Sequence, residues 1–360
     1  MLEPRSSTVV VPAGGKNVGA YAAGAWRPFV SVVIPCLNEE QFIAQVLERL
    51  LPQYDDGRFE IVIVDGLSTD RTRAIVADCA ARWTRTSIRF IDNPARHIPV
   101  ALNLGIAAAR GDVIVRMDAH SLPSANYVRR CVELLCAGAG DVVGMPWDIR
   151  AGAETVTARA IALAVAHPFG IGDAQYRLAH EGAPRSVDTV PFGVFRKTLW
   201  QELGGFNEAL LANEDYDFNY RVRRNGGRVL LDTAAHAAYF ARPTLAELAR
   251  QYFRYGRWKS QMLKLHPRSM RWRHAVAPVF VAALCALALL GFWRHLAWWF
   301  LLLAAAAYLL PALAFACALA RRAKEVKLLP PIIAAFFVIH CAWGGGFWRG
   351  LLGTPAAASA

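Results

Sequence analysis

The sequence predicts an α/β domain built on a mostly parallel sheet flanked by helices, followed by a C-terminal transmembrane helical region. Strand-like and helix-like patterns alternate along residues 29–118, which is typical of a parallel sheet covered by helices. Apolar residues then dominate from Ala275 onward, in a chain of 360 residues that is 55% hydrophobic overall. Residues 1–28 are small and polar and lack the apolar core of a signal peptide, so we expect a disordered lead-in there.

Each element of the front domain follows from its local pattern. The strands are apolar, β-branched runs, and the helices carry apolar residues at helical spacing. The alternating elements are the strands Phe29–Pro35, Phe59–Asp65, Ile88–Asp92 and Asp112–Asp118, and the helices Glu39–Leu51, Thr69–Trp83 and His97–Ala109. Residues 150–186 lose this regularity, and we interpret them as a flexible or substrate-facing insertion. Val190–Arg196 and Lys197–Leu203 then predict another strand and helix, so the domain is expected to cover residues 29–241.

The positive charge of the chain is confined to its C-terminal third. Residues 242–275 hold nine Lys or Arg against one acid, whereas the net charge of the whole chain is +12. Because this excess adjoins apolar stretches and the front domain is nearly neutral, a membrane surface explains it better than nucleic acid. We therefore expect residues 242–275 to form a basic, amphipathic interfacial segment. The seven cysteines include no CxxC pair, which fits reduced thiols on the cytoplasmic side.

Three apolar segments follow, at residues 276–293, 296–320 and 328–348. A bilayer core of about 30 Å needs about 20 helical residues, so about three transmembrane helices are predicted. The third segment contains Pro330-Pro331 and Gly344–Gly346, which leaves a broken or re-entrant helix open. The alternative is a buried helical bundle in a soluble protein. The basic stretches before the first span and at Arg321–Lys327 should face the cytoplasm, which puts the C-terminal end outside.

Polar side chains follow three of the predicted strands. Asn38 and Glu39 follow the first strand, Asp65 ends the second, and Asp118 with His120 ends the fourth. Since the carboxyl ends of parallel strands meet at one edge of a sheet, these loops can converge on one ligand. For Asn38 and Glu39, helix capping is the simpler alternative.

The strongest pair is Asp118 and His120. In an extended segment their side chains point the same way and can ligate one cation. One carboxylate and one imidazole suit Mn²⁺ or Mg²⁺ that also takes oxygen ligands from phosphates. The alternative is a surface histidine with no metal role.

Two further motifs carry candidate chemistry. Asp215 lies in the acidic run Asn213–Asp217 and is a candidate general base, a role open to it even with the low pKa of an ordinary carboxylate. The alternative is that these acids only complement the helix dipole. Later, Arg254, Arg257 and Trp258 are spaced so that they can meet a diphosphate and a sugar ring, or form an interfacial aromatic belt.

These motifs together resemble glycosyltransferase family 2, a large inverting family with the GT-A fold. The resemblance runs from about Phe29 to Lys259 and rests on SVVIPCLNEE, IVIVDGLSTD, ALNLGIAAARGDVIVRMDAH, LGGFNEALLANEDYDFNYRVRRNGG and QYFRYGRWK in that order. With the C-terminal spans, the chain looks most like bacterial β-1,3-glucosyltransferases that extend succinoglycan-type exopolysaccharide on a lipid carrier.

The resemblance implies a role for each candidate residue. The donor-binding residues would be Pro35, Asn38, Glu39, Asp65 and Asp118; the metal ligands Asp118 and His120; the catalytic pair Asp215 and Glu214; and the acceptor or diphosphate contacts Arg221, Arg254, Arg257 and Trp258. His120 stands where the family's DxD motif has its second acid. Arg254 stands for the leading Gln of the QxxRW motif of processive synthases.

The resemblance also implies partners and a location. These are a nucleotide-diphosphate sugar donor, a divalent metal (Mn²⁺ or Mg²⁺), a lipid-linked oligosaccharide acceptor, membrane lipids and other exopolysaccharide assembly enzymes, with no nucleic acid. The expected place is the bacterial inner membrane, multi-pass, with the catalytic domain in the cytoplasm. Alternatives are a polyprenyl-phosphate monosaccharide synthase, a processive polysaccharide synthase, and a membrane-anchored sugar-nucleotide sensor. A nicotinamide oxidoreductase is disfavoured because no GxGxxG follows the first strand.

Overall fold

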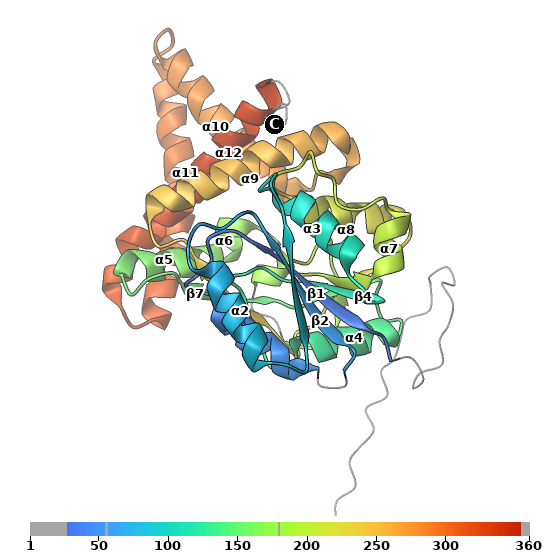
Figure 1. Cartoon of the computed structure of the whole chain (residues 1–360). Coiled ribbons are helices and arrows are strands. Elements are labelled where there is room, and N and C mark those ends of the chain that lie inside the picture. The colour runs from blue at the N-terminus through green and yellow to red at the C-terminus, as the bar shows by residue number, and fades with distance from the viewer. Residues whose placement is uncertain (1–26, 55–56, 179–180, 354–360) are drawn as a thin grey trace, which may run out of the picture.

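A computed structural model describes residues 27–54, 57–178 and 181–353 of the chain. The lead-in predicted for residues 1–28 therefore lies, as far as residue 26, outside the described residues. The described chain forms an α/β domain with a group of long helices packed against one side of it (Figure 1).

The main sheet has eight strands in the order β3-β2-β1-β4-β9-β6-β10-β8. They are β1 Val30–Cys36, β2 Phe59–Asp65, β3 Ser87–Asp92, β4 Val113–Arg116, β6 Val142–Gly144, β8 Arg185–Ser186, β9 Val194–Arg196 and β10 Val229–Leu231. The first four strands are mutually parallel, as predicted. β9 runs antiparallel to both β4 and β6, a reversal that the alternating pattern did not indicate. The carboxyl ends of β1, β2 and β4 therefore share one edge.

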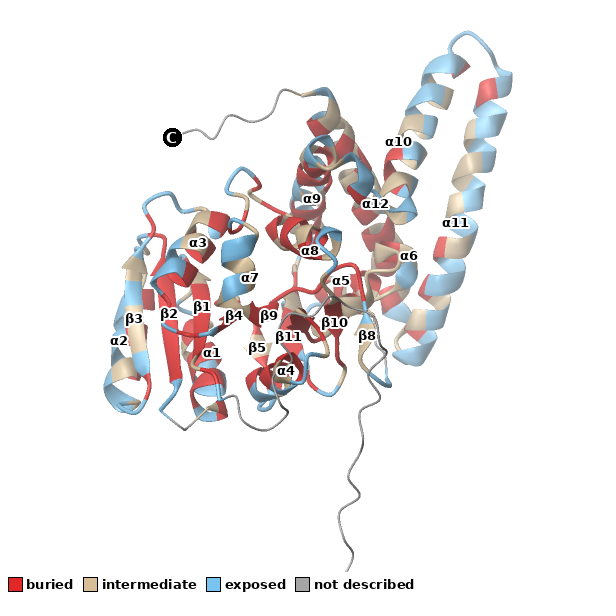
Figure 2. Cartoon of the chain, turned by 90° about the vertical axis from the view of Figure 1, so that its right-hand side faces the viewer, coloured by how far each residue is buried: buried red, intermediate tan, exposed pale blue. Residues whose placement is uncertain are grey.

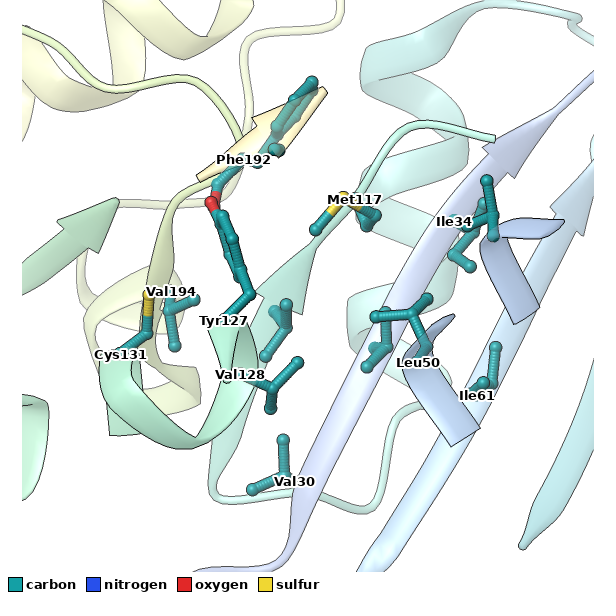
Figure 3. Packing of buried hydrophobic residues seen from close by; sticks show 14 of the residues in the cluster. Val30, Ile34, Leu50, Ile61, Met117, Tyr127, Val128, Cys131, Phe192 and Val194 are labelled. Atoms are coloured by element: carbon teal, nitrogen blue, oxygen red, sulfur yellow. The ribbon is translucent and has the colours of Figure 1, made fainter. Parts of the chain in front are cut away.

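Alternation along the strands produces a core on each face of this sheet. In β2, Ile61 joins one apolar cluster while Val62 joins the other. The first cluster is covered by α1 Ile43–Leu50, α2 Thr72–Arg82 and α4 Tyr127–Cys136; part of it, including Ile61 and Tyr127, is shown in Figure 3. The second is covered by α3 Ile98–Ala108, α7 Lys197–Glu202 and α8 Glu214–Arg224. Packing on both faces fixes the strand ends that carry the candidate site.

The segment predicted as a flexible or substrate-facing insertion forms short regular elements. They are α5 Val156–Val165, α6 Pro168–Ile171 and the 3₁₀ turn Gln175–Arg177, and they adjoin a three-stranded sheet of β5 Leu122–Pro123, β11 Ala237–Ala241 and β7 Trp147–Ala151. The ring of Phe169 in α6 packs on Tyr308 and Phe336 of the C-terminal helices. The described part of this segment therefore joins the domain to the helices.

The C-terminal region contains three helices that are long and apolar enough to cross a membrane: α10 Trp272–Gly291, α11 Leu296–Arg322 and, after the 3₁₀ turn Val326–Leu328, α12 Leu329–Leu352. α10 begins four residues before the predicted 276. α12 is continuous through Gly344–Gly346, and its prolines lie in the first turn, where a helix tolerates them, so the broken-helix alternative is wrong. Figure 2 shows α10 and α11 projecting with much exposed surface, which a buried soluble bundle would not leave.

The predicted interfacial segment forms α9 Leu245–Leu265, which packs along α12. A Cβ atom on Gly346 would lie 2.1 Å from the carbonyl oxygen of Phe253, and one on Gly350 would lie 2.2 Å from Oγ of Ser260. Only glycine allows this approach, and Gly256 of α9 meets the α12 backbone as closely. Because the contact positions rise together in both helices, α9 and α12 run in the same direction.

Candidate active site

One cavity of about 580 Å³ connects the edge of the main sheet with the C-terminal helices. At the sheet end it is lined by Arg116, Asp118, His120, Glu214 and Asp215. At the other end α10, α11 and α12 line it with Val276, Ala277, Phe280, Tyr308, Ile339 and Trp343. A charged pocket and an apolar pocket are thus parts of one space.

Arg116, the last residue of β4, organises the charged end. Its guanidinium group forms ion pairs with Asp118 at 3.1 Å, with Glu214 at 3.2 Å and with Asp215, although Arg116 is only 4% exposed. Arg116 is not among the residues predicted from the sequence. The sequence did contain a signal for it, because a single base in the apolar strand sequence VIVRMD would be buried and would need partners of opposite charge.

The first turn of α8 carries the two other carboxylates. Asn213 caps this helix in the left-handed conformation (φ 66°), so Glu214 and Asp215 begin the helix where its dipole favours negative charge. Burial raises the pKa of Asp215; Arg116 opposes this, while Glu214 and Asp118 raise the pKa further. The expected low pKa is therefore wrong for this carboxylate. A carboxylate with a raised pKa is a stronger proton acceptor once it is ionised.

The candidate metal pair does not have the expected geometry. Asp118, Ala119 and His120 follow β4 in a turn closed by a hydrogen bond from the Ser121 N–H to the Asp118 carbonyl, 3.3 Å, so the argument from an extended segment is wrong. Both side chains nevertheless line the cavity. Nδ1 of His120 lies 2.8 Å from Oε1 of Glu39, which leaves Nε2 for another partner.

Metal-binding histidines are commonly oriented by a carboxylate in this way. Burial opposes charge on the His120 ring, but the hydrogen bond that Glu39 accepts and the negative charges of Asp118 and Glu39 together raise the pKa of His120, so protons would compete for this nitrogen at low pH. Within the described residues, no group of three or more His, Cys, Asp or Glu side chains is arranged to hold a metal. Asp118 and His120 are two candidate ligands, and a Mn²⁺ or Mg²⁺ ion between them would take its other ligands from phosphates and water.

The expected donor residues lie together beside this cavity, at the same sheet edge. Pro35 and Asp65 are in the paired strands β1 and β2, and the buried Asp65 accepts hydrogen bonds from the loop that follows it. Oδ1 of Asn38 accepts the backbone N–H of Thr69 at 2.8 Å, which braces the two loops against each other. Pro35, Asn38, Glu39 and Asp65 do not line the cavity themselves. Glu39 is linked to the cavity only by its contact with His120, which does line it.

Arg221 does not reach the cavity. It pairs with Asp217 at 2.8 Å and donates to the carbonyl oxygens of Leu203 and Gly205 at 2.8 and 2.7 Å. Its side chain therefore holds the loop between α7 and α8. It lies away from the cavity, so the predicted contact with an acceptor or diphosphate is not supported. Asp217, the third acid of the run, is likewise occupied by Arg221 and by His266 at 2.8 Å.

The expected motif on α9 is displaced by about one turn. Gln251, Arg254 and Tyr255 line the cavity, whereas Arg257 is exposed elsewhere and Trp258 is buried in an apolar cluster. The spacing Gln-x-x-Arg followed by an aromatic residue thus occurs at 251–255, with Tyr in place of Trp. Of the three residues predicted here, the structure brings only Arg254 to the site.

Comparisons with known proteins agree on one family. The family model described as "Glycosyl transferase family 2" matches residues 31–203. Succinoglycan biosynthesis protein ExoA of Rhizobium meliloti (strain 1021) is 31% identical over 324 residues, which are 89% of this chain and 94% of that protein. The dolichyl N-acetyl-alpha-D-glucosaminyl phosphate 3-beta-D-2,3-diacetamido-2,3-dideoxy-beta-D-glucuronosyltransferase of Methanococcus voltae is 24% identical over 336 residues, 90% of this chain and 97% of that one.

A solved structure has the same fold. The mannosyltransferase PcManGT from Pyrobaculum calidifontis, in complex with GDP-Man and Mn²⁺, aligns with a TM-score of 0.58 at 20% identity, covering 91% of this chain and 88% of its own. The GT-A fold is thereby confirmed. On the extent of the ExoA similarity, this chain belongs to glycosyltransferase family 2 and is a glycosyltransferase.

Proposed function

We propose that this enzyme is an inverting, metal-dependent transferase that adds glucose from UDP-glucose to a polyprenyl-diphosphate-linked oligosaccharide in bacterial exopolysaccharide synthesis. One observation carries the proposal: the cavity that holds the carboxylates continues between helices apolar enough to enter a membrane. An acceptor that carries a polar saccharide on an apolar lipid chain would match the charged end and the apolar end of this cavity. The similarity to a succinoglycan biosynthesis protein over most of the chain supports the assignment to exopolysaccharide.

In the proposed mechanism, Asp215 is the general base. It takes the proton from the acceptor hydroxyl while that oxygen attacks the anomeric carbon of the donor from the face opposite the nucleotide. The bond from this carbon to the diphosphate breaks, and the configuration inverts. Arg116 holds Asp215 and Glu214 at the cavity. A divalent ion held by Asp118 and His120 would supply positive charge for the diphosphate leaving group.

The sheet-edge loops would bind the donor. In this proposal Pro35, Asn38, Glu39 and Asp65 cradle the uridine part, because their loops meet at the sheet edge beside Asp118. Arg254, which lines the cavity from α9, would contact the acceptor or the diphosphate.

A polyprenyl-phosphate monosaccharide synthase remains the nearest alternative. The Methanococcus voltae relative is named for transfer to a dolichyl-linked sugar phosphate and matches along 90% of this chain, which supports extension of a lipid-linked sugar instead. A processive synthase would release a long polymer, and a sensor would show no turnover.

The test is an assay of the full-length protein with radiolabelled nucleotide sugars. UDP-glucose and a lipid-linked oligosaccharide should give one added sugar in the presence of Mn²⁺ or Mg²⁺, and EDTA should abolish transfer until the metal is restored. Labelled polyprenyl-phosphate glucose would establish the carrier-lipid alternative. Release of a long polymer would establish the processive synthase. If no donor supports transfer, the sugar-nucleotide sensor is the alternative that is left.

The proposed site of action is the bacterial inner membrane, with the catalytic domain in the cytoplasm. We propose that α10 and α11 cross the membrane as a hairpin and that α12 lies with α9 at the inner face. α9 carries Arg250, Arg254 and Arg257 on exposed positions, and a helix packed parallel to it along this length shares its depth. This revises the three-span topology.

A reporter fused to the C-terminus tests the two-span topology. The hairpin arrangement puts the reporter on the cytoplasmic side, so a C-terminal fluorescent protein should be bright and a C-terminal alkaline phosphatase inactive. An active alkaline phosphatase would show that α12 crosses the membrane as well.

A further inference from the structure

Two buried cations in the cavity have no carboxylate partner in the described chain. Lys259 is 4% exposed, and its Nζ lies 3.2 Å from the centre of the Tyr216 ring. Arg177 is 8% exposed, donates to the hydroxyl of Tyr252 at 3.0 Å and lies over the ring of Trp147 at 4.8 Å. Among residues 27–54, 57–178 and 181–353, no Asp or Glu is within ion-pair distance of either.

The other buried cations of this cavity are paired, which makes these two unusual. Arg116 has three carboxylates, and Arg273 pairs with Asp173 and Asp188. A buried charge without a partner destabilises the fold unless a ligand supplies the opposite charge. Burial and the charge of Arg273 lower the pKa of Lys259 well below its usual range, as expected for a cation without its counter-charge. Both side chains line the same cavity, where an anionic ligand could supply the missing negative charge.

The contacts of these two cations place them between the ends of the cavity. Lys259 lies against Tyr216, the residue after Asp215. Arg177 bonds to Tyr252, which belongs to the apolar cluster that includes Ile339 of α12. Lys259 is thus next to the helix that carries Asp215, and Arg177 is next to the apolar helices.

We propose that Lys259 and Arg177 bind the phosphate groups that join the acceptor saccharide to its lipid carrier. This inference rests on the proposed function. It adds which residues hold the acceptor in a fixed position and through which chemical groups they do so. The saccharide then extends toward Asp215, and the lipid chain follows Phe280 and Ile339 between the helices. The donor diphosphate belongs to the Asp118 end, so the two phosphate groups of the reaction occupy separate sites.

The test measures binding to the full-length protein in detergent, with undecaprenyl diphosphate as the acceptor probe and UDP with Mn²⁺ as the donor probe. Lys259→Met and Arg177→Met are each expected to raise Kd for undecaprenyl diphosphate about tenfold or more, because each loses a charge-assisted hydrogen bond. Kd for UDP should stay within about twofold. Lys259→Arg should retain most of the lipid affinity. Arg257→Met is the matched control, being exposed on the same helix and outside the cavity lining.

Stability provides a second measurement. Removing an unpaired buried charge should leave the Tm of the ligand-free Lys259→Met protein unchanged or higher, so loss of lipid binding cannot be attributed to misfolding. Inorganic pyrophosphate separates a lipid site from a free-anion site, and it should bind at least tenfold more weakly than the lipid.

Three results would overturn the inference: unchanged lipid affinity in both variants, a loss confined to UDP, or equal affinity for pyrophosphate and lipid. The proposed function fails separately. A protein that binds the lipid through Lys259 but transfers no sugar would refute the transferase reaction and leave this site standing. A protein that transfers sugar but whose lipid affinity does not change in Lys259→Met would refute this site and leave the transferase reaction standing.

Discussion

Asp215→Asn is expected to lower the rate of sugar transfer by about 10²–10⁴-fold, the contribution of a positioned general base. Asn keeps the size and one oxygen of the side chain, so it can still accept a hydrogen bond from Arg116, but it cannot take a proton. The donor probe UDP with Mn²⁺ should bind normally, since the loss affects the reaction step and leaves the sheet-edge loops unchanged. Turnover and Kd for UDP, measured on the same preparation, separate these effects.

Glu214→Gln is the matched control for that experiment. Glu214 is the neighbour of Asp215 on α8 and contacts the same guanidinium group, at 3.2 Å. If only Asp215 is the base, the Gln variant should keep much more activity than Asp215→Asn. Retained turnover in Asp215→Asn, or an equal loss in both variants, would show that the catalytic proton goes elsewhere.

Arg116→Met should have the largest effect on stability of any single change in the charged pocket. It leaves Asp118, Glu214 and Asp215 together without their shared cation, and breaking a buried ion pair from one side costs about 3–5 kcal/mol. The Tm of the variant should fall measurably. Adding Glu214→Gln to it should restore part of the stability, because one of the repelling charges is then removed.

The same variant has a defined pH signature. Arg116 holds down the pKa of Asp215 against burial and the neighbouring carboxylates, so its removal should raise that pKa further. A general base acts only when ionised, and activity is present above its pKa. The acidic limb of the kcat/KM profile should therefore move to higher pH in any active fraction. Arg116→Lys keeps the charge and should shift the limb less, whereas an unmoved limb in Arg116→Met would separate Arg116 from the base.

The fold was predictable because it depends on periodic patterns. Alternation placed β2 at Phe59–Asp65 as observed and put the other parallel strands within one or two residues. The pattern carries no information on strand direction, so the antiparallel β9 at the centre of the sheet was not foreseen. The sequence also did not show that α12 is continuous through Gly344–Gly346. We interpreted these glycines as a possible break, whereas Gly344 allows close contact with α10 and Gly346 with α9.

The candidate site was predictable where a residue's place at the end of a strand or the start of a helix determined it. Asp118 follows a strand end and Asp215 begins a helix, and both line the cavity. Residues on helices were less certain, because one turn separates Arg254, which faces the cavity, from Arg257, which does not. The sequence marks Arg116 as a base in an apolar strand, but it does not show which carboxylates surround that base, so Arg116 was not predicted as part of the site.

The shared cavity has a practical consequence for engineering this enzyme. Its walls come from two parts of the chain that protein engineers would treat as separate modules, the sheet-bearing domain and the C-terminal helices. A soluble fragment ending before α10 would keep the carboxylates and lose one wall of the pocket that surrounds them. Chimaeras that exchange sugar specificity between relatives should therefore take the cavity-lining parts of the sheet-bearing domain and of the C-terminal helices from the same parent.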